Sequence, residues 1–279
     1  MTVLEDIILE HDKRGIAPLR QSIPSDYLNR SAEIVLSNVG KVFITTGFYI
    51  LTAGTIETDG PPGAIALGNG LEKLGYEVVY ITDSYASKFL DEYRSHKSRL
   101  IDFPICSDEE SGKYSKTLLA EEKPAILISI ERCGRSHDGL YRNMRNLSIT
   151  EYTAQIDRLF DLHNTTIGIG DGGNEIGMGN VYKAVEKSAQ LVEDPAITKV
   201  SELVISSVSN WGGYGLLAQL SQATGINLLP NIIDEKEMIE GMVNLGAVDG
   251  VTGKSVYQVD GFELNQNAII LDNLAKELG

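Results

Sequence analysis

The sequence predicts an α/β fold in which a mostly parallel sheet is covered by helices on both faces, as a three-layer sandwich. Short apolar runs rich in β-branched residues alternate with longer helical patterns, and glycine-rich, charged stretches directly follow several of the apolar runs. This alternation is typical of parallel sheets, because a crossover must precede each strand that runs in the same direction. With 279 residues and 42% hydrophobic content, the chain can bury a large core without disulfides.

Six apolar runs are expected to form the strands. They cover residues 42–45, 78–81, 100–103, 126–130, 166–169 and 203–206. Helices are expected between them where turn residues bracket a helical pattern, as at residues 64–74, which follow Pro61 and Pro62 and precede Gly75. Further helices are expected at residues 84–93, 107–122, 149–162, 179–192, 215–223 and 235–245.

Residues 1–40 are expected to form a helical lead-in to a single domain that spans residues 1–279. A helical pattern over residues 25–39 ends at Gly40, and no repeat, low-complexity tract or Pro/Ser-rich linker divides the chain. The opening MTVLEDIILEHDKRG lacks the basic and apolar regions of a secretory signal. No window approaches the roughly 20 apolar residues that span a bilayer, so we expect a soluble protein.

Charge and cysteine content narrow the partners and the compartment. Lys and Arg number 24 against 39 Asp and Glu, which gives a formal net charge of −15. That charge disfavours nucleic acid, whose phosphates bind basic patches, although acidity alone also fits a well-solvated surface. Cys106 and Cys133 form no C-x-x-C pair, so neither a disulfide framework nor a thiolate zinc site is indicated. A reducing cytoplasm fits best.

The glycine-rich, charged stretches are expected to assemble one site. They are TGFYILTAGTIETDGPPGA, TDS, ERCGRSHDGLYRNMR, GDGGNEIGMGN and SVSNWGGYG, and each follows an expected strand. In an open parallel sheet these loops lie at one edge, and ligands bind in the crevice outside the carboxyl ends of the strands. The sequence therefore predicts a site built from at least four separated loops.

The stretch GDGGNEIGMG, residues 170–179, admits two classes of ligand. Gly168, Gly170 and Gly173 match G-x-G-x-x-G, the dinucleotide-binding fingerprint. A single match of this kind is weak evidence for a dinucleotide site. Asp171 and Glu175 place carboxylates where a pyrophosphate needs amide donors, so we reject a dinucleotide. Carboxylates beside the carboxamide of Asn174 suit a hard cation such as Mg²⁺ or Mn²⁺. The alternative is that these residues cap the following helix.

Two acidic residues in TIETDGPPGA, Glu57 and Asp59, precede a proline-containing turn into a helix. Because proline restricts the backbone, we expect this turn to be rigid. Asp59 is then either the N-cap of that helix or a fixed carboxylate for a metal or an amine.

Four arginines crowd into ERCGRSHDGLYRNMR, residues 131–145, of an otherwise acidic protein. Arginine binds carboxylates in a bidentate fork, so this loop could hold an anionic substrate while Glu131 and Asp138 face a metal or a reacting amine. The alternative is that these charges pair with one another. Two further candidates are Cys133, as a nucleophile, and His137, as an acid or base.

The only tryptophan, Trp211, follows an expected strand and precedes Gly212 and Gly213. Its ring either lines the pocket of the predicted site or packs in the core beneath a helix. Both roles place an apolar ring after a buried strand, so the sequence leaves them open.

Four motifs occur in the order TDGPPGA, ERCGRSHDGLYRNMR, GDGGNEIGMG and SNWGGYG, and together they resemble the D-glutamate cyclase family. The late stretch VDGVTGKSVYQVDG is a fifth motif, and the resemblance spans roughly residues 45–261. One motif alone would mean little, but four in order with similar spacing are highly specific. The family closes D-glutamate into 5-oxo-D-proline with loss of water.

The resemblance implies a metal-dependent lyase that acts on a small anionic amino acid. A carboxylate is a poor electrophile, so a divalent metal, Mn²⁺ or Mg²⁺, would polarise it, held by Asp59, Glu131, Asp171 and Glu175. The base would be Asp138 or Glu57, and the α-carboxylate would be fixed by Arg132, Arg135 or Arg145. Substrate contacts would come from Asn143, Asn174, Asn210, Trp211 and Gly212.

Two other functions are compatible with the sequence. A metal-dependent phosphoryl hydrolase would use the same acidic loops to hold one or two cations. A non-catalytic protein would bind a metal or a small acid without turnover. A homo-oligomer is also compatible, although no sequence pattern marks an interface.

Overall fold

The computed structural model describes residues 3–279 and is built around one six-stranded sheet. The strands lie in the order β5-β4-β1-β6-β7-β8, and each neighbouring pair is parallel. They are β1 (Lys41–Thr45), β4 (Glu77–Thr82), β5 (Arg99–Asp102), β6 (Ile126–Ile130), β7 (Thr166–Gly170) and β8 (Glu202–Ile205). The six predicted strands are confirmed, and their bounds agree to within one residue.

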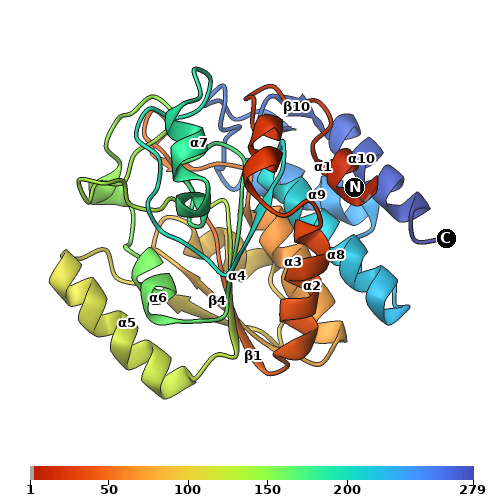
Figure 1. Cartoon of the computed structure of the whole chain (residues 1–279), viewed down its shortest axis with the longest axis horizontal. Coiled ribbons are helices and arrows are strands. Elements are labelled where there is room, and N and C mark those ends of the chain that lie inside the picture. Colours follow the sequence, from red (N-terminus) through yellow and green to blue (C-terminus); the bar gives the residue numbers. More distant parts are fainter. Residues whose placement is uncertain (1–2) are drawn as a thin grey trace.

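Helices cover both faces of the sheet, which confirms the predicted three-layer α/β architecture (Figure 1). One layer contains α1 (Val3–Ile8), α2 (Tyr27–Ser37), α3 (Pro61–Lys73), α4 (Ser87–Tyr93), α8 (Ser209–Thr224), α9 (Ile232–Asn244) and α10 (Leu264–Lys276). The other contains α5 (Asp108–Glu122) and α6 (Asp157–Leu162). Successive strand residues face opposite layers, so Ile44 packs in the larger core and Phe43 in the smaller one.

Two expected helices differ from the structure. Residues 149–162 form a 3₁₀ turn (Thr150–Tyr152) and then α6, because the backbone between them is drawn into a buried ion pair. There the amide of Ala154 donates to Asp83 and its carbonyl accepts from Arg132. Residues 179–192 contain the end of a 3₁₀ turn (Met178–Asn180) and the short α7 (Tyr182–Glu186), so the long helix expected there is wrong.

Several elements leave little pattern in the sequence. The pairs β2 (Tyr49–Ile50) with β3 (Thr55–Ile56) and β9 (Gln258–Val259) with β10 (Phe262–Glu263) are antiparallel and only two residues long per strand. Helix α10 was not predicted either.

Within the described residues, no helix is long and apolar enough to cross a membrane.

The lead-in is packed onto the same layer as α8. Helices α1 and α2 both contact α8, and Tyr27 donates a hydrogen bond to the carbonyl of Ile205 at the end of β8. Nearly all of α8 is buried, so it is the centre of this layer. The residues between α1 and α2 therefore lie close to the carboxyl edge of the sheet.

The close packing of β7 can be tested with two glycines. A Cβ atom at Gly168 would lie 2.4 Å from the backbone oxygen of Ile176, whereas a Cβ at Gly112, inside α5, would meet nothing within 4 Å. We expect Gly168→Ala to destabilise the protein by about 1–3 kcal/mol. Gly112→Ala should stabilise it by about 0.5–1 kcal/mol, because alanine loses less entropy in a helix. Urea unfolding midpoints would check both, and equal midpoints would contradict the packing described.

Candidate active site

The functional loops meet at the carboxyl edge of the sheet, where the strand order reverses between β1 and β6. Glu131 follows β6, Asp171 follows β7, and Ser209 begins α8 after β8. Asp59 lies in the loop before α3 and reaches the start of α8. The predicted convergence of separate loops at this edge is confirmed by these contacts.

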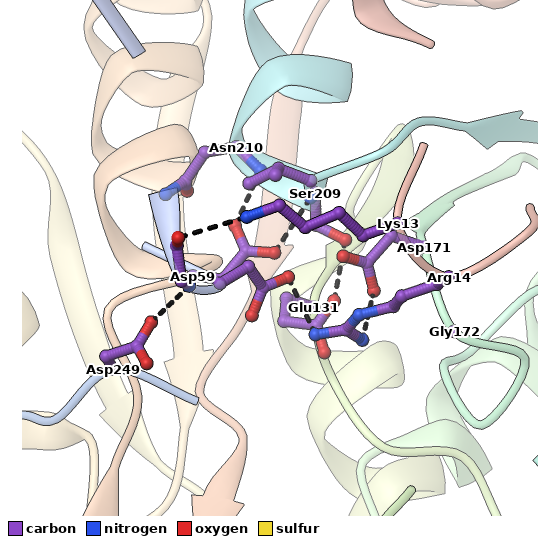
Figure 2. Close-up of polar contacts among 12 residues, drawn as sticks. Lys13, Arg14, Asp59, Glu131, Asp171, Gly172, Ser209, Asn210 and Asp249 are labelled. Atoms are coloured by element: carbon purple, nitrogen blue, oxygen red, sulfur yellow. Dashed lines mark hydrogen bonds and ion pairs between the residues drawn. The ribbon is translucent and has the colours of Figure 1, made fainter. Parts of the chain in front are cut away.

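A group of five buried carboxylates forms what we call the acidic cluster: Asp59, Glu131, Asp171, Glu175 and Asp260. Oxygens of Asp59, Asp171 and Asp260 lie within 4.8 Å of one another, and so do oxygens of Glu131, Asp171 and Glu175. Asp171 belongs to both groups and lies beside Glu131 in Figure 2. The structure therefore brings together all four residues predicted as metal ligands and adds Asp260.

Asp59 accepts from the adjacent amide of Gly60 and is held mainly by the start of α8. It accepts hydrogen bonds from the backbone amides of Ser209 and Asn210, each at 2.8 Å. The side chain of Asn210 in turn accepts from the amides of Gly60 and Gly63 at the start of α3. Each loop thus caps the helix of the other. Of the two alternatives left open for Asp59, capping of α3 does not describe the structure, because Asn210 caps that helix.

Glu175 closes the turn that carries Asp171. Its two carboxylate oxygens accept from the amides of Asp171, Gly172 and Gly173, at 3.1, 2.6 and 2.7 Å. Asp171 accepts from Arg14 through Oδ1, while its Oδ2 is buried and has no hydrogen-bond partner in the described part of the chain. The cap alternative for these two residues does not describe the structure, since both face inward at the turn.

Sequence reasoning missed three residues of this edge: Asp260, Asp249 and Arg14. Asp249 accepts from the amides of Thr252 and Gly261 and so folds the loop that carries Asp260. Both aspartates lie in the fifth motif, VDGVTGKSVYQVDG, at its repeated VDG (residues 248–250 and 259–261), but neither copy follows a strand of the main sheet, so no site role was assigned to them. Arg14 lies in the lead-in, where no motif marks it.

The acidic cluster holds its carboxylates in an unfavourable electrostatic environment. Burial and, after it, the nearby Asp260 raise the pKa of Asp59 to about 8, although the amides of Asn210 and Ser209 oppose this. Burial, followed by neighbouring carboxylates, also raises the pKa of Glu57 and Glu131. Such values are typical of sites that handle protons or bind cations.

Backbone strain occurs at two cluster residues. Glu131 has φ 44° and Asp260 has φ 51°, in the left-handed region that non-glycine residues rarely adopt. Gly60 has φ 97°, and a Cβ there would lie 2.7 Å from the Cβ of Glu131. Strain of this kind persists where the surroundings fix the conformation, and it is frequent at functional sites.

A pocket of about 610 Å³ opens above the acidic cluster. Its charged and amide-bearing lining residues are Arg14, Glu57, Glu131, Asn143, Arg145, Asn174 and Lys254. Glu57 and Glu131 are buried, whereas Arg145 and Lys254 are exposed. Negative groups therefore lie deep in the pocket, and the two exposed cations lie near its opening. Lys254 is a further residue that sequence reasoning missed.

Two of the predicted substrate arginines are engaged elsewhere. Arg132 is buried, donates to Asp83 at 2.5 Å, and also donates to the carbonyls of Gly47 and Ala154. Arg135 pairs with Asp157 at 2.6 Å and with a second aspartate of α6. Neither lines the pocket, so the structure does not bring them to the candidate site.

Arg145 differs from its neighbours in the same loop. Arg142 pairs with the exposed Asp138, so Asp138 also lies away from the pocket. Among the described residues, every arginine except Arg145 has a carboxylate partner within 4.0 Å. Arg145 is therefore the arginine left free to meet a ligand.

The remaining candidates divide between core and surface. Trp211 is buried, packs against Phe262 and donates to Asn267, which matches its predicted alternative as a core residue. Gly212 packs against β7, and Asn210 caps α3 as described, so neither lines the pocket. Burial raises the pKa of the Cys133 thiol, which disfavours a nucleophilic role. His137 lines a different pocket, beside α7.

Comparisons with known proteins agree with the resemblance noted in the sequence. A family model described as D-glutamate cyclase-like, C-terminal, matches residues 4–275. The mitochondrial D-glutamate cyclase of Homo sapiens is 32% identical over 315 residues, which cover 97% of this chain and 50% of that protein. The chain thus spans about half the length of the curated relative that it matches.

A solved structure also resembles this chain, but only weakly. The ligand-free aldohexose dehydrogenase of Thermoplasma acidophilum aligns over 86% of this chain and 88% of its own, at 10% identity. Its TM-score of 0.28 is too low to support an argument about fold or function.

The raised pKa of Asp59 predicts how the stability of the metal-free protein depends on pH. Between the ordinary value of 3.8 and about 8, the folded chain binds more protons at Asp59 than the unfolded chain does. Stability should therefore fall as pH rises through this window. In Asp59→Asn that fall should be smaller, as measured by thermal midpoints in chelator.

Glu122→Gln provides the control for this measurement. In the wild type, hydrogen bonds from Arg99 and Lys41 lower the pKa of Glu122 to about 2, which is below the pH window in which Asp59 acts. The pH slope above pH 4.5 should therefore match that of the wild type. An Asp59→Asn protein with an unchanged slope would contradict the assignment.

Proposed function

The chain belongs to the D-glutamate cyclase-like family, and we propose that it is a metal-dependent hydro-lyase that cyclises D-glutamate to 5-oxo-D-proline and water. The observation that carries this proposal is a pocket with buried carboxylates at its base and an unpaired arginine near its opening. An amino dicarboxylate needs both, because its carboxylates require cations and its ammonium group requires a base.

The donor set of the acidic cluster fits a divalent cation. Asp171 Oδ2 and Asp260 Oδ1 are buried and have no hydrogen-bond partner among the described residues, and Asp59 adds a third carboxylate close by. Buried charged oxygens are costly unless a cation compensates them, and an all-oxygen set suits Mg²⁺ or Mn²⁺. When bound, such a cation supplies polarisation of the γ-carboxylate and stabilises the developing oxyanion.

This assignment changes the ligand set implied by the sequence. Asp260 joins Asp59 and Asp171 as a proposed ligand, with Glu131 close enough to Asp171 to contribute. Glu175 becomes a support, since both of its oxygens already accept backbone amides. Groups that orient metal ligands in this way tune the affinity of a site.

Arg145 is proposed to bind the α-carboxylate of the substrate. It lines the pocket and has no carboxylate partner among residues 3–279, and a guanidinium binds a carboxylate through two parallel hydrogen bonds. Asn143 and Asn174 line the same pocket and can hydrogen-bond to the substrate. Holding the α-carboxylate at the opening directs the γ-carboxylate towards the acidic cluster.

The reaction forms one C–N bond and breaks one C–O bond. The amine nitrogen of D-glutamate attacks its own γ-carboxyl carbon, and a five-membered lactam closes. One γ-carboxyl oxygen leaves as water with the two protons that the ammonium group loses. The pocket supports this step by holding both ends of a flexible substrate, which lowers the entropic cost of ring closure.

Glu57 is the proposed base. It is buried, lines the pocket, and has a pKa raised by burial and then by Asp260 and Asp59, so it can take a proton from the ammonium group and return it to the leaving oxygen. Asp138 is exposed and paired with Arg142, so it is the weaker of the two predicted bases.

The cytoplasm is the proposed compartment. Cys106 and Cys133 are both free thiols, as expected for a reducing environment. The mitochondrial relative shows that a second compartment occurs in proteins of similar sequence.

The proposed activity predicts metal-dependent lactam formation from D-glutamate and little from L-glutamate. Metal-stripped protein would be incubated with each isomer, with and without Mn²⁺ or Mg²⁺, and the products separated by chiral chromatography. Asp171→Asn should abolish both cation binding and turnover, because it removes a central ligand. Asp138→Asn is the matched control and should keep both.

Turnover of a chromogenic phosphate ester instead of D-glutamate would favour a phosphoryl hydrolase. Tight binding of a metal or small acid without any product would favour a non-catalytic binding protein.

The role of Arg145 predicts a selective loss of substrate binding. Arg145→Gln should raise KM for D-glutamate by about 10–100-fold, the value of a charge-assisted hydrogen bond, with a smaller change in kcat. Arg142→Gln, three residues away and paired with Asp138, should leave KM near the wild-type value. Equal effects of the two substitutions would exclude Arg145 as the carboxylate-binding residue.

A further inference from the structure

Arg14 reaches the acidic cluster from the lead-in, far along the chain from the other cluster residues (Figure 2). Its Nη1 donates to Asp171 Oδ1 at 2.9 Å, and its Nη2 lies 2.7 Å from Asp260 Oδ2. The guanidinium therefore contacts one oxygen of each carboxylate. The other oxygens, Asp171 Oδ2 and Asp260 Oδ1, are buried and unpartnered within the described residues.

A tight turn presents Arg14 to the cluster. The carboxylate of Asp12 accepts from the backbone amides of Gly15, Ile16 and Ala17, at 2.7, 3.0 and 2.9 Å. Gly15 has φ 79°, which a residue with a side chain rarely adopts. The chain thus reverses around a single carboxylate, and the position of Arg14 is set by local structure before any ligand binds.

The same turn is tied to the loop that carries Asp260. Lys13 donates to the carbonyl of Gly261 at 3.0 Å, and its ammonium group lies 3.4 Å from the ring centre of Phe262. These contacts flank Asp260 on its carboxyl side. Arg14 and Asp260 are therefore held together by contacts other than their own ion pair.

Arg14 is well matched to its surroundings in charge. Its side chain is only 17% exposed, and its guanidinium pairs with Asp171 at 2.9 Å and with Asp260 at 2.7 Å. When all five buried carboxylates are ionised, they carry more negative charge than one divalent cation can balance. A second positive charge beside Asp171 and Asp260 reduces their mutual repulsion.

We propose that Arg14 is a built-in cation that occupies a second cation position between Asp171 and Asp260, so that the acidic cluster has room for one divalent cation rather than two. This inference rests on the proposed metal site. Arg14 acts as a positioning residue, because it holds Asp171 through Oδ1 and Asp260 through Oδ2, the two carboxylates that would bind the divalent cation. Removing its charge should open the second position to an ion from solution.

The test counts Mn²⁺ ions bound per chain by equilibrium dialysis and elemental analysis. Arg14→Gln should bind one more Mn²⁺ than the wild type does. Arg14→Lys, which keeps the charge, should bind the wild-type number. The matched control is Arg20→Gln, which removes a charge from the same segment, where Arg20 pairs with Asp6 away from the cluster.

The outcomes separate this inference from the proposed function. Wild-type protein that binds no Mn²⁺ would contradict the proposed metal site, yet one extra ion in Arg14→Gln would still support the role of Arg14. The same number of ions in Arg14→Gln and wild type, or fewer, would overturn it. If Arg14→Gln folds only with metal, it should be purified in Mn²⁺. Added Mn²⁺ should then raise the thermal unfolding midpoint of Arg14→Gln by more than it raises that of the wild type. An equal gain would also overturn the inference.

Discussion

Mutual repulsion among buried carboxylates is the constraint on which the carboxyl edge of this fold depends. Asp59, Glu131, Asp171, Glu175 and Asp260 are removed from water and lie close together. Burial disfavours the charged forms of Asp59, Glu131 and Asp171. The surrounding structure offsets this cost with fixed dipoles and one cation. Asp59 faces the first amides of α8, Glu175 is enclosed by amides of its own turn, and Arg14 lies between Asp171 and Asp260.

These compensating contacts also hold the fold together, because they join segments that are distant in sequence. The reciprocal capping by Asp59 and Asn210 ties the start of α3 to the start of α8. The contacts of Lys13 and Arg14 tie the lead-in to the last hairpin and to the loop after β7. Left-handed backbone at Glu131 and Asp260 is tolerated because these neighbours fix it. The site is thus rigid before it binds a ligand, as efficient positioning of a substrate requires.

The loop of residues 131–145 shows how one cluster of arginines serves different purposes. Arg132 stabilises the junction of three loops through Asp83 and two carbonyls, and Arg135 fastens α6. Arg142 pairs at the surface, which leaves Arg145, among the arginines of the described residues, without a carboxylate partner beside the pocket. Breaking a buried pair such as Arg132 with Asp83 costs about 3–5 kcal/mol, so the first of these is a structural requirement of the site.

The sequence by itself determined the sheet and the edge at which the site forms. The six strands are short, apolar and bounded by turn residues, and parallel strands must end at a common edge, so Asp59, Glu131 and Asp171 were expected there. Only the tertiary structure decided which side chains take part. Arg14 and Asp260 lie outside the strand-end loops, and the partners of Arg132, Arg135 and Asp138 are set by packing between distant segments. A pattern along the chain specifies which residues share an element, whereas hydrogen bonds and ion pairs across the fold depend on distances that no local pattern contains.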